Sequence, residues 1–374
     1  MSRALLSFGG AFIIFFSGVT ILATTLGLEG CTKKSETPDI GSGIGANSQT
    51  HSQKREVSLA IWANYLPAEL QAEFTKQTGI QLRVSNFSSN EELLAKVQAG
   101  ASGIDVAVPS DYMVDVMIKL ALLEPIDSTK IPNRAGIDPQ VLKQDYDPEN
   151  RFSLPYAWST AGIAINRDLY KGTIRSWKDF FTNKDLAGKV MILDDAREVI
   201  GAALKMNGFS VNTVNPAELA KAKETLKAFR PRVKMFRSDV VDPLVNKEVV
   251  AAHCYSSEPL LAHTRTDAKI DYIIPEEGGT RAIDNMVIFK GSAHTPEALE
   301  LINFLLRKET NVAFVKKNFG GPVVLATRAA LPPELQKSPI LFPAPGSLSK
   351  LERIHDLGEA NRLYERIWTE LKAE

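Results

Sequence analysis

The first half of the chain alternates apolar and polar residues in patterns that predict strands and helices in turn. Alternation with a period of two, or a short apolar run, predicts three strands at residues 57–61, 80–84 and 104–108. Between the first two strands, apolar residues four positions apart predict a helix that Pro67 opens and Gly79 ends. A second helix is predicted from Asn90, with acids in its first turn, where the helix dipole favours negative charge. This β-α-β-α-β order is typical of a parallel sheet covered by helices.

The second half of the chain repeats this kind of pattern without repeating the sequence. Strands are predicted at residues 190–193, 248–254 and 270–274, and helices at residues 198–206 and 216–229. Two further apolar segments, 161–166 and 283–289, have the extended pattern expected of strands that cross between two lobes. The periodicity therefore predicts an α/β protein of two lobes, each a mixed, mainly parallel sheet flanked by helices.

The N-terminal segment has the composition of a targeting signal. After Arg3, residues 4–28 carry no charge, which predicts a signal peptide over residues 1–30. The segment ends at Cys31 in a pattern that resembles the bacterial lipobox, although Glu29 stands where that pattern has a small or apolar residue. The alternative is an uncleaved membrane anchor, because residues 4–28 are long enough to span a bilayer. Both interpretations place the rest of the chain outside the inner membrane.

Residues 31–56 are polar and rich in Ser and Gly. Such a composition cannot bury enough apolar surface to fold, so we expect a flexible tether lipidated at Cys31. The folded part would then lie in the periplasm or cell envelope, anchored to a membrane by its lipid.

Composition and motifs narrow the classes of function. The chain has 44 Lys plus Arg and 44 Asp plus Glu, so its formal charge is zero and nucleic acid is not an expected partner. Two cysteines are too few for a disulfide-stapled scaffold. The sequence has no nucleophile elbow, no phosphate-binding loop and no H-E-x-x-H, and its five histidines show no metal-ligand spacing. We therefore expect no enzyme activity, metal or cofactor.

The neighbouring residues His253 and Cys254 are the one apparent metal pair. Successive residues of a strand point to opposite faces, so both side chains cannot reach the same ion. This geometry favours a core histidine over a metal ligand.

Polar and aromatic residues recur where the predicted strands end. These residues are Trp62 and Tyr65, Ser110 and Tyr112, Asp194 to Glu198, Tyr255 to Glu258, and Asp284. Ligands of parallel α/β sheets bind at this carboxyl edge. Aromatic faces mixed with carboxylates suit an organic cation, because the rings cover methylene groups and the acids receive the charge.

Several of these residues have a structural alternative. Asp195 with Glu198 three residues later forms a capping box, and Ser110 has the position of a helix cap. Trp62 and Tyr65 could simply cover the top of a core. Asp284 differs, because an unpaired carboxylate in its apolar segment would be costly.

An ordered series of segments resembles the spermidine/putrescine-binding proteins of bacterial ABC transporters. The segments are residues 61–67 (Ile-Trp-Ala-Asn-Tyr-Leu-Pro), 73–80, 104–110, 154–158, 193–199 (Leu-Asp-Asp-Ala-Arg-Glu-Val), 275–279 and 301–307. The resemblance extends over about residues 57–370. It implies a type II periplasmic-binding-protein fold that closes over its ligand by a hinge motion. The implied lobes are residues 57–163 with 286–335, and residues 164–285 with 336–374.

The same resemblance implies a binding site for a polyamine, in which an aromatic box holds the carbon chain and acids receive the ammonium groups. The matching positions are Trp62, Tyr65, Ser110, Tyr112, Asp195, Glu198, Ser238, Tyr255 and Asp284, and Glu258 matches the putrescine-binding branch. The chain departs from the family at Asn64 in place of an acid, Ala282 in place of an aromatic residue, Tyr255 in place of Trp, and Ile354 in place of a polar residue. Arg281 lies near Asp284 in sequence, but strand alternation should turn it to the opposite face.

The resemblance implies a monomeric, substrate-binding lipoprotein that captures putrescine or spermidine and delivers it to a permease driven by an ATPase. The alternative is a ligand-sensing or surface lipoprotein of the same fold that binds another small basic solute. An extracytoplasmic hydrolase is disfavoured, because the residue inventory offers no activated nucleophile.

Overall fold

The computed structural model describes residues 55–100 and 103–373 of the chain. The predicted signal peptide over residues 1–30, Cys31 and the tether up to residue 54 lie outside the described residues. The last predicted tether residue, Glu56, is the first residue of strand β1 (Glu56–Trp62). Among the described residues, no helix is both long and apolar enough to cross a membrane.

The first lobe is built on a sheet in the order β2-β1-β3-β9-β4. Its strands are β1, β2 (Gln81–Phe87), β3 (Val106–Ala107), β9 (Gly279–Ile288) and the first half of β4 (Ser153–Asn166). Strand β1 pairs in parallel with β2 and β3, whereas β9 runs antiparallel to β3 and β4. The helices of this lobe are α1 (Ala68–Thr78), α2 (Asn90–Gln98), α3 (Asp111–Lys119), α9 (Thr295–Leu305), α10 (Lys308–Asn318), α11 (Thr327–Ala330) and α12 (Pro333–Gln336).

Strand β1 shows why its sequence forms a central strand. Val57, Leu59 and Ile61 point into one hydrophobic cluster, and Ala60 points into another cluster on the opposite face. A parallel strand covered on both faces needs apolar residues at successive positions. The following helix ends as predicted, because Gly79 adopts a left-handed conformation with φ 70° and its N–H donates to the Thr75 carbonyl.

The second lobe continues the same sheet in the order β4-β7-β5-β6, with β8 also paired to β4. Its strands are β5 (Val190–Ile192), β6 (Val233–Phe236), β7 (Ala251–Tyr255), β8 (Ile270–Ile273) and the second half of β4. Strands β6 and β7 run parallel to β5, and β7 and β8 run antiparallel to β4. The helices are α4 (Trp177–Thr182), α5 (Ala196–Met206), α6 (Pro216–Phe229), α7 (Val241–Val245), α8 (Ser257–His263) and α14 (Asn361–Ala373).

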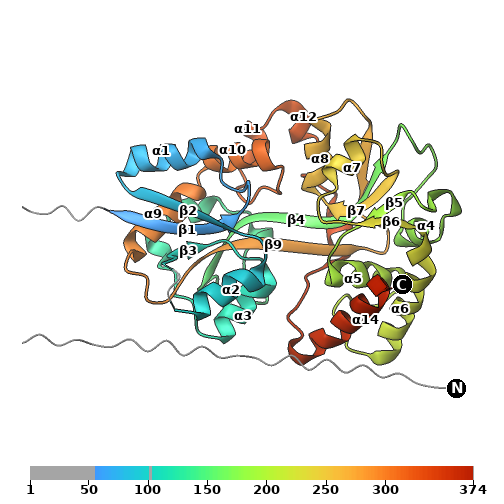
Figure 1. The fold of residues 1–374 in the computed structure, drawn as a ribbon. Helices are drawn as coiled ribbons and strands as arrows, with labels where there is room; N and C mark the ends of the chain where they lie inside the picture. The colour runs from blue at the N-terminus through green and yellow to red at the C-terminus, as the bar shows by residue number, and fades with distance from the viewer. Residues whose placement is uncertain (1–54, 101–102, 374) are drawn as a thin grey trace, which may run out of the picture. The chain divides into compact units, whose positions relative to one another are not determined.

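Strands β4 and β9 connect the two lobes, as the sequence pattern predicted (Figure 1). The first part of β4, Ser153–Thr160, pairs with β9, and its residues 161–165 pair with β7 of the second lobe. Helix α13 (Pro345–Leu348) and strand β10 (Leu351–Glu352) follow later in the chain, and β10 pairs with the start of β9. The predicted residue boundaries of the lobes stay a prediction. Within residues 336–374, Leu341 packs in the first core and Tyr364 in the second.

His253 and Cys254 lie on opposite faces of β7, as strand alternation predicted. The His253 ring packs edge-on against Trp177 with ring centroids 4.9 Å apart, and burial lowers the pKa of His253 to about 3. Cys254 is a buried free thiol in the cluster on the other face, where burial raises its pKa. His253 is therefore a neutral core residue, and no group of metal-ligating side chains occurs among the described residues.

Candidate functional site

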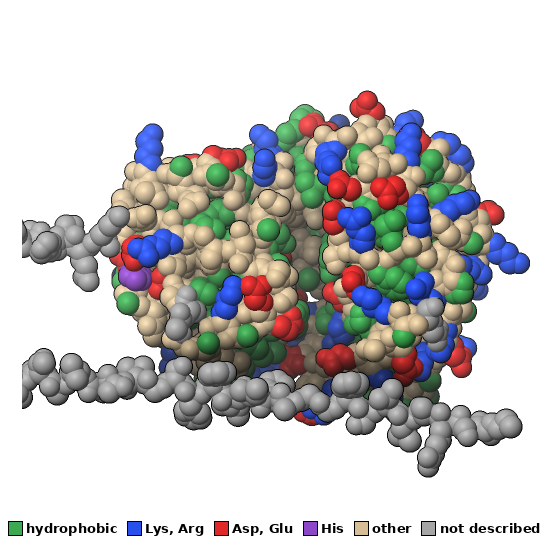
Figure 2. All heavy atoms as spheres, in the orientation of Figure 1, with side chains coloured by type: hydrophobic (Ala, Val, Ile, Leu, Met, Phe, Trp, Pro, Cys, Tyr) green, Lys and Arg blue, Asp and Glu red, His purple; other side chains and the backbone are tan. Residues whose placement is uncertain are grey.

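A cavity of about 470 Å³, here called the inter-lobe cleft, is lined by residues from both lobes. Nine of the ten predicted binding residues line it: Trp62, Tyr65, Ser110, Tyr112, Asp195, Glu198, Ser238, Tyr255 and Asp284. The space-filling view shows a hollow between the two lobes, with acidic side chains on both sides of its lower part (Figure 2). Sequence segments more than 200 residues apart therefore meet around one cavity.

Asp284 lies on β9 and is only 6% exposed. Its carboxylate accepts hydrogen bonds from the Tyr65 hydroxyl at 2.9 Å and the Ser110 hydroxyl at 2.8 Å. Burial raises the pKa of Asp284 to about 6, and the two hydrogen bonds oppose that rise. Ser110 precedes α3 but makes no side-chain cap hydrogen bond, so its hydroxyl serves Asp284 and does not cap the helix.

Backbone geometry brings these three side chains together. An isolated antiparallel bridge pairs Ser110 with Asp284, next to the β3–β9 pairing. Tyr65 follows a turn in which Asn64 has a φ of 64°, a left-handed conformation that asparagine tolerates better than most residues. The Tyr65 ring then packs against Tyr156 and Phe314, which fixes the direction of its hydroxyl. Asn64 itself does not line the cleft.

Asp195 and Glu198 lie at the N-terminus of α5 in the second lobe. Asp195 caps the helix, because its carboxylate accepts from the backbone N–H groups of Arg197 at 2.9 Å and Glu198 at 3.1 Å. Glu198 does not complete the predicted capping box, because its carboxylate accepts from the Thr280 hydroxyl at 2.6 Å. Burial and then the charge of Asp195 raise the pKa of Glu198.

Aromatic side chains form part of the cleft wall. Trp62 packs edge-on against Phe87, with ring centroids 4.5 Å apart. The Tyr112 hydroxyl accepts from the Asn90 amide at 3.0 Å and donates to Glu91 at 2.9 Å. The Tyr255 hydroxyl lies 3.4 Å from Asp195 and donates to it. Ala282 and Ile354, two of the residues that differ from the family pattern, also line the cleft and face its cavity.

Glu258 is the one predicted site residue that does not line the cleft. It lies in the first turn of α8, where its carboxylate accepts from the backbone N–H groups of Tyr255 at 3.0 Å and Val240 at 3.5 Å. Burial raises the pKa of Glu258 to about 8. In this structure Glu258 holds the backbone that presents Tyr255.

Three acids that the sequence reasoning did not single out as binding residues also line the cleft: Glu91, Asp111 and Asp194. Glu91 and Asp111 stand in the first turns of α2 and α3, immediately after Asn90 and Ser110. The sequence already showed acids in the first turn of the helix that starts at Asn90, and Asp111 follows Ser110 directly after the third predicted strand. Their place at the carboxyl edge of the sheet is the signal that could have identified both as cleft residues.

The cleft is rich in acids that lack a cationic partner. The acids that line it are Glu91, Asp111, Asp194, Asp195, Glu198 and Asp284. Among the described residues, only Asp194 of these six acids forms an ion pair, with Lys372. In the described part of the chain, Arg281 is the one basic residue that lines the cleft, and its guanidinium lies over the Trp158 ring at 5.4 Å from its centroid. Buried carboxylates without cations are costly unless a ligand supplies positive charge. This arrangement is chemically suited to an organic cation.

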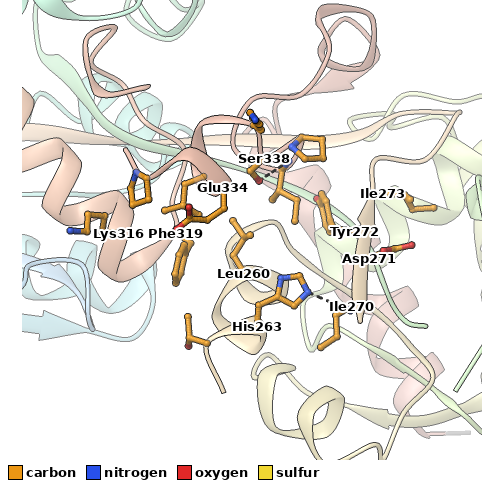
Figure 3. A pocket seen from close by; sticks show the side chains of 16 residues that line it. Leu260, His263, Ile270, Asp271, Tyr272, Ile273, Lys316, Phe319, Glu334 and Ser338 are labelled. Atoms are coloured by element: carbon orange, nitrogen blue, oxygen red, sulfur yellow. Dashed lines mark hydrogen bonds between the residues drawn. The ribbon is translucent and has the colours of Figure 1, made fainter. Parts of the chain in front are cut away.

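A second and larger cavity, the α8–α12 cavity, has a volume of about 860 Å³ (Figure 3). Its walls carry apolar side chains from both lobes, including Leu260, Ile270 and Phe319. Its two acids, Asp271 and Glu334, are matched by two lysines, Lys316 and Lys337. Because its charges balance, this cavity lacks the excess of acids that distinguishes the inter-lobe cleft.

Comparisons with known proteins identify the family of the chain. The sequence matches the family model of bacterial extracellular solute-binding proteins over residues 69–343. It is 35% identical to the spermidine/putrescine-binding periplasmic protein of Salmonella typhimurium, over 88% of this chain and 95% of that protein. It is 31% identical to a putrescine/cadaverine-binding protein of Pseudomonas aeruginosa, over 88% of this chain and 96% of that protein.

Solved structures show the same fold. The spermidine/putrescine ABC transporter substrate-binding protein PotD of Streptococcus pneumoniae superposes with a TM-score of 0.79 at 28% identity, over 85% of this chain and 99% of that chain. The Tp0655 (TpPotD) lipoprotein of Treponema pallidum superposes with a TM-score of 0.77 at 31% identity, over 85% of this chain and 100% of that chain. The expected type II periplasmic-binding-protein fold is thereby confirmed, and the chain belongs to the bacterial extracellular solute-binding proteins.

Proposed function

We propose that this protein captures a linear polyamine, such as putrescine or spermidine, in the inter-lobe cleft and delivers it to an ABC permease. The observation that carries the proposal is the set of buried carboxyls without cationic partners that line the cleft from both lobes. The similarity to spermidine/putrescine-binding and putrescine/cadaverine-binding proteins supports the same class of ligand.

In the proposed binding mode, acids bind the ammonium groups of the ligand and aromatic rings cover its methylene groups. Asp195 and Glu198 in the second lobe receive one ammonium group, and Asp284 receives another from the crossing strand β9. Charge-assisted hydrogen bonds of this kind are about twice as strong as neutral ones. The rings of Trp62 and Tyr255 cover the methylene groups between the ammonium groups, which cannot form hydrogen bonds.

Binding to both lobes at once gives the ligand a way to change the conformation of the protein. A ligand that contacts both lobes favours the closed arrangement by the free energy of those contacts. The crossing strands β4 and β9 are then the hinge, and the closed form is the one delivered to the permease. The lipid at Cys31 would keep the protein close to that permease.

The test is calorimetric titration of protein freed of bound ligand with putrescine, spermidine and 1,4-butanediol. The diol has the carbon chain of putrescine without its charges, so the two amines should bind and the diol should not. The control variant is Asp271→Asn, which removes an acid from the α8–α12 cavity and should leave amine binding unchanged. Asp271 is 53% exposed at its side chain and pairs only with Arg167, a surface ion pair of small free energy. Absence of binding by both amines to folded protein would overturn the polyamine assignment.

A further inference from the structure

Asp111 is a buried acid of the cleft that has no role in the proposed binding mode. It is the first residue of α3 and only 2% exposed. One carboxylate oxygen accepts from its neighbour's backbone N–H, that of Tyr112, at 2.7 Å, and the other accepts from that of Ile283 at 3.2 Å. Each oxygen keeps a free lone pair. Among the described residues, Asp111 forms no ion pair.

The charged groups around Asp111 come from several elements. Burial raises the pKa of Asp111 to about 7; the nearby Arg353 opposes this rise and the charge of Asp284 adds to it. Arg353 is already held by Asp145 at 2.9 Å. The charge of Asp111 in turn contributes to the raised pKa of Glu198 and acts on Arg281 and Tyr146. The charge of Asp284 therefore raises the pKa of Asp111, and the charge of Asp111 raises the pKa of Glu198.

We propose that Asp111 is a third anionic position of the inter-lobe cleft and determines its selectivity for a triamine over a diamine. The inference rests on the proposed function and deepens it. The three buried acids of the cleft mark three positions: Glu198, with Asp195 beside it at the N-terminus of α5, Asp111 on α3, and Asp284 on β9. A diamine has two ammonium groups and leaves one position empty, whereas a triamine has a positive charge for each.

The two ligands interact differently with Asp111 because a buried charge is costly without a cation. With a diamine bound, no ligand ammonium group reaches Asp111, so its carboxyl, whose pKa burial raises to about 7, stays partly protonated at pH 7. With a triamine bound, the third ammonium group favours the ionised form, so Asp111 gives up its proton and gains a charge-assisted hydrogen bond. The triamine therefore gains an interaction at Asp111 that the diamine does not.

The decisive experiment titrates wild-type protein and Asp111→Asn with spermidine and putrescine at pH 7. Asparagine has the same shape and keeps one carbonyl acceptor, so the hydrogen bonds to the backbone are only partly lost. We expect spermidine affinity to fall about tenfold or more and putrescine affinity to fall less than about threefold, since only spermidine loses a hydrogen bond to a charged group. Equal losses for both amines, or no loss, would overturn the role of Asp111.

A second readout, measured first on wild-type protein, separates binding from a purely structural role. Calorimetry in buffers of different ionisation enthalpy measures the protons released on binding, and wild-type protein should release more with spermidine than with putrescine. Asp111→Glu, which keeps the charge, should retain a preference for spermidine. Equal proton release for the two amines overturns the inference, even if Asp111→Asn does not fold. Failure of both amines to bind wild-type protein would instead overturn the proposed function.

Discussion

Asp284 has two neutral hydrogen-bond donors and no cation, although its carboxyl is almost fully buried. Tyr65 and Ser110 satisfy part of its hydrogen-bonding capacity, so the side chain keeps one orientation without ligand. They do not neutralise its charge. A cationic ligand therefore finds an acceptor that is already positioned and gains the full benefit of its charge.

Changing Asp284 to Asn separates affinity from stability. The variant should bind putrescine and spermidine about 10-fold to 100-fold more weakly, because a neutral amide replaces a charge-assisted acceptor. Its carbonyl can still accept from Tyr65 or Ser110, so the free energy of unfolding should change little. Titration calorimetry and denaturant unfolding measure the two quantities. A large loss of stability with unchanged affinity would show that Asp284 is structural.

The same pair of proteins gives a pH-dependent prediction. The pKa of Asp284 in the folded protein is about 6, above the value of about 4 for an unfolded aspartate. The folded state therefore retains its proton over a wider pH range, and the contribution of Asp284 to stability is fully present below pH 4 and lost as the pH rises through 6. The free energy of unfolding of wild type minus that of Asp284→Asn, measured without ligand, should fall from about pH 4 to about pH 7. A difference that rises over this range contradicts the raised pKa.

At the scale of single elements, the sequence predicted most of the strands and helices that place the cleft. The alternation of Val57, Leu59 and Ile61 predicted β1 to within a residue at each end, because one face of the strand is fully buried while most residues of the other face are half-buried. The crossing strands were predicted too short. In the first part of β4, Leu154, Tyr156 and Trp158 alternate with smaller residues, but Pro155 within the segment argues against a strand. The first part of β9, residues 279–282, has no alternating pattern.

The contacts within the cleft could not be predicted from the periodicity of the sequence. The bridge between Ser110 and Asp284 depends on the register of segments 174 residues apart, which local patterns do not encode. Glu198 was predicted within a capping box, but its preference for Thr280 follows from the position of β9. The residue types were therefore predictable, whereas the partners were set by the tertiary fold.

The role of Gly79 in ending helix α1 can be tested with a pair of glycine-to-alanine variants. Gly79→Ala should lower the free energy of unfolding by about 1 kcal/mol, because alanine is strained at a φ of 70° although its Cβ meets no atom within 4 Å. Gly346→Ala, in α13, has similar open space without a positive φ and should leave stability unchanged or raise it. Denaturant unfolding measures both variants. Equal effects at both positions would show that the left-handed conformation at Gly79 is not what matters.

In the folded unit as a whole, strands β4 and β9 connect the two lobes, and a closing motion would bend these strands. Saturating spermidine should reduce the radius of gyration measured by small-angle X-ray scattering, because a ligand held by acids of both lobes favours the closed form. The diol 1,4-butanediol should leave the scattering curve unchanged. If calorimetry shows spermidine bound and the curve stays the same, closure does not accompany binding.

The buried thiol of Cys254 has a practical consequence. It is the only cysteine in the described part of the chain, it is fully buried, and its pKa is raised, so it forms little reactive thiolate. A cysteine introduced at the exposed Ser88, which lines the cleft, would then be the residue of this part that a maleimide dye labels. The fluorescence of that dye would change as the cleft fills, which would make the folded unit an optical reporter of polyamine concentration.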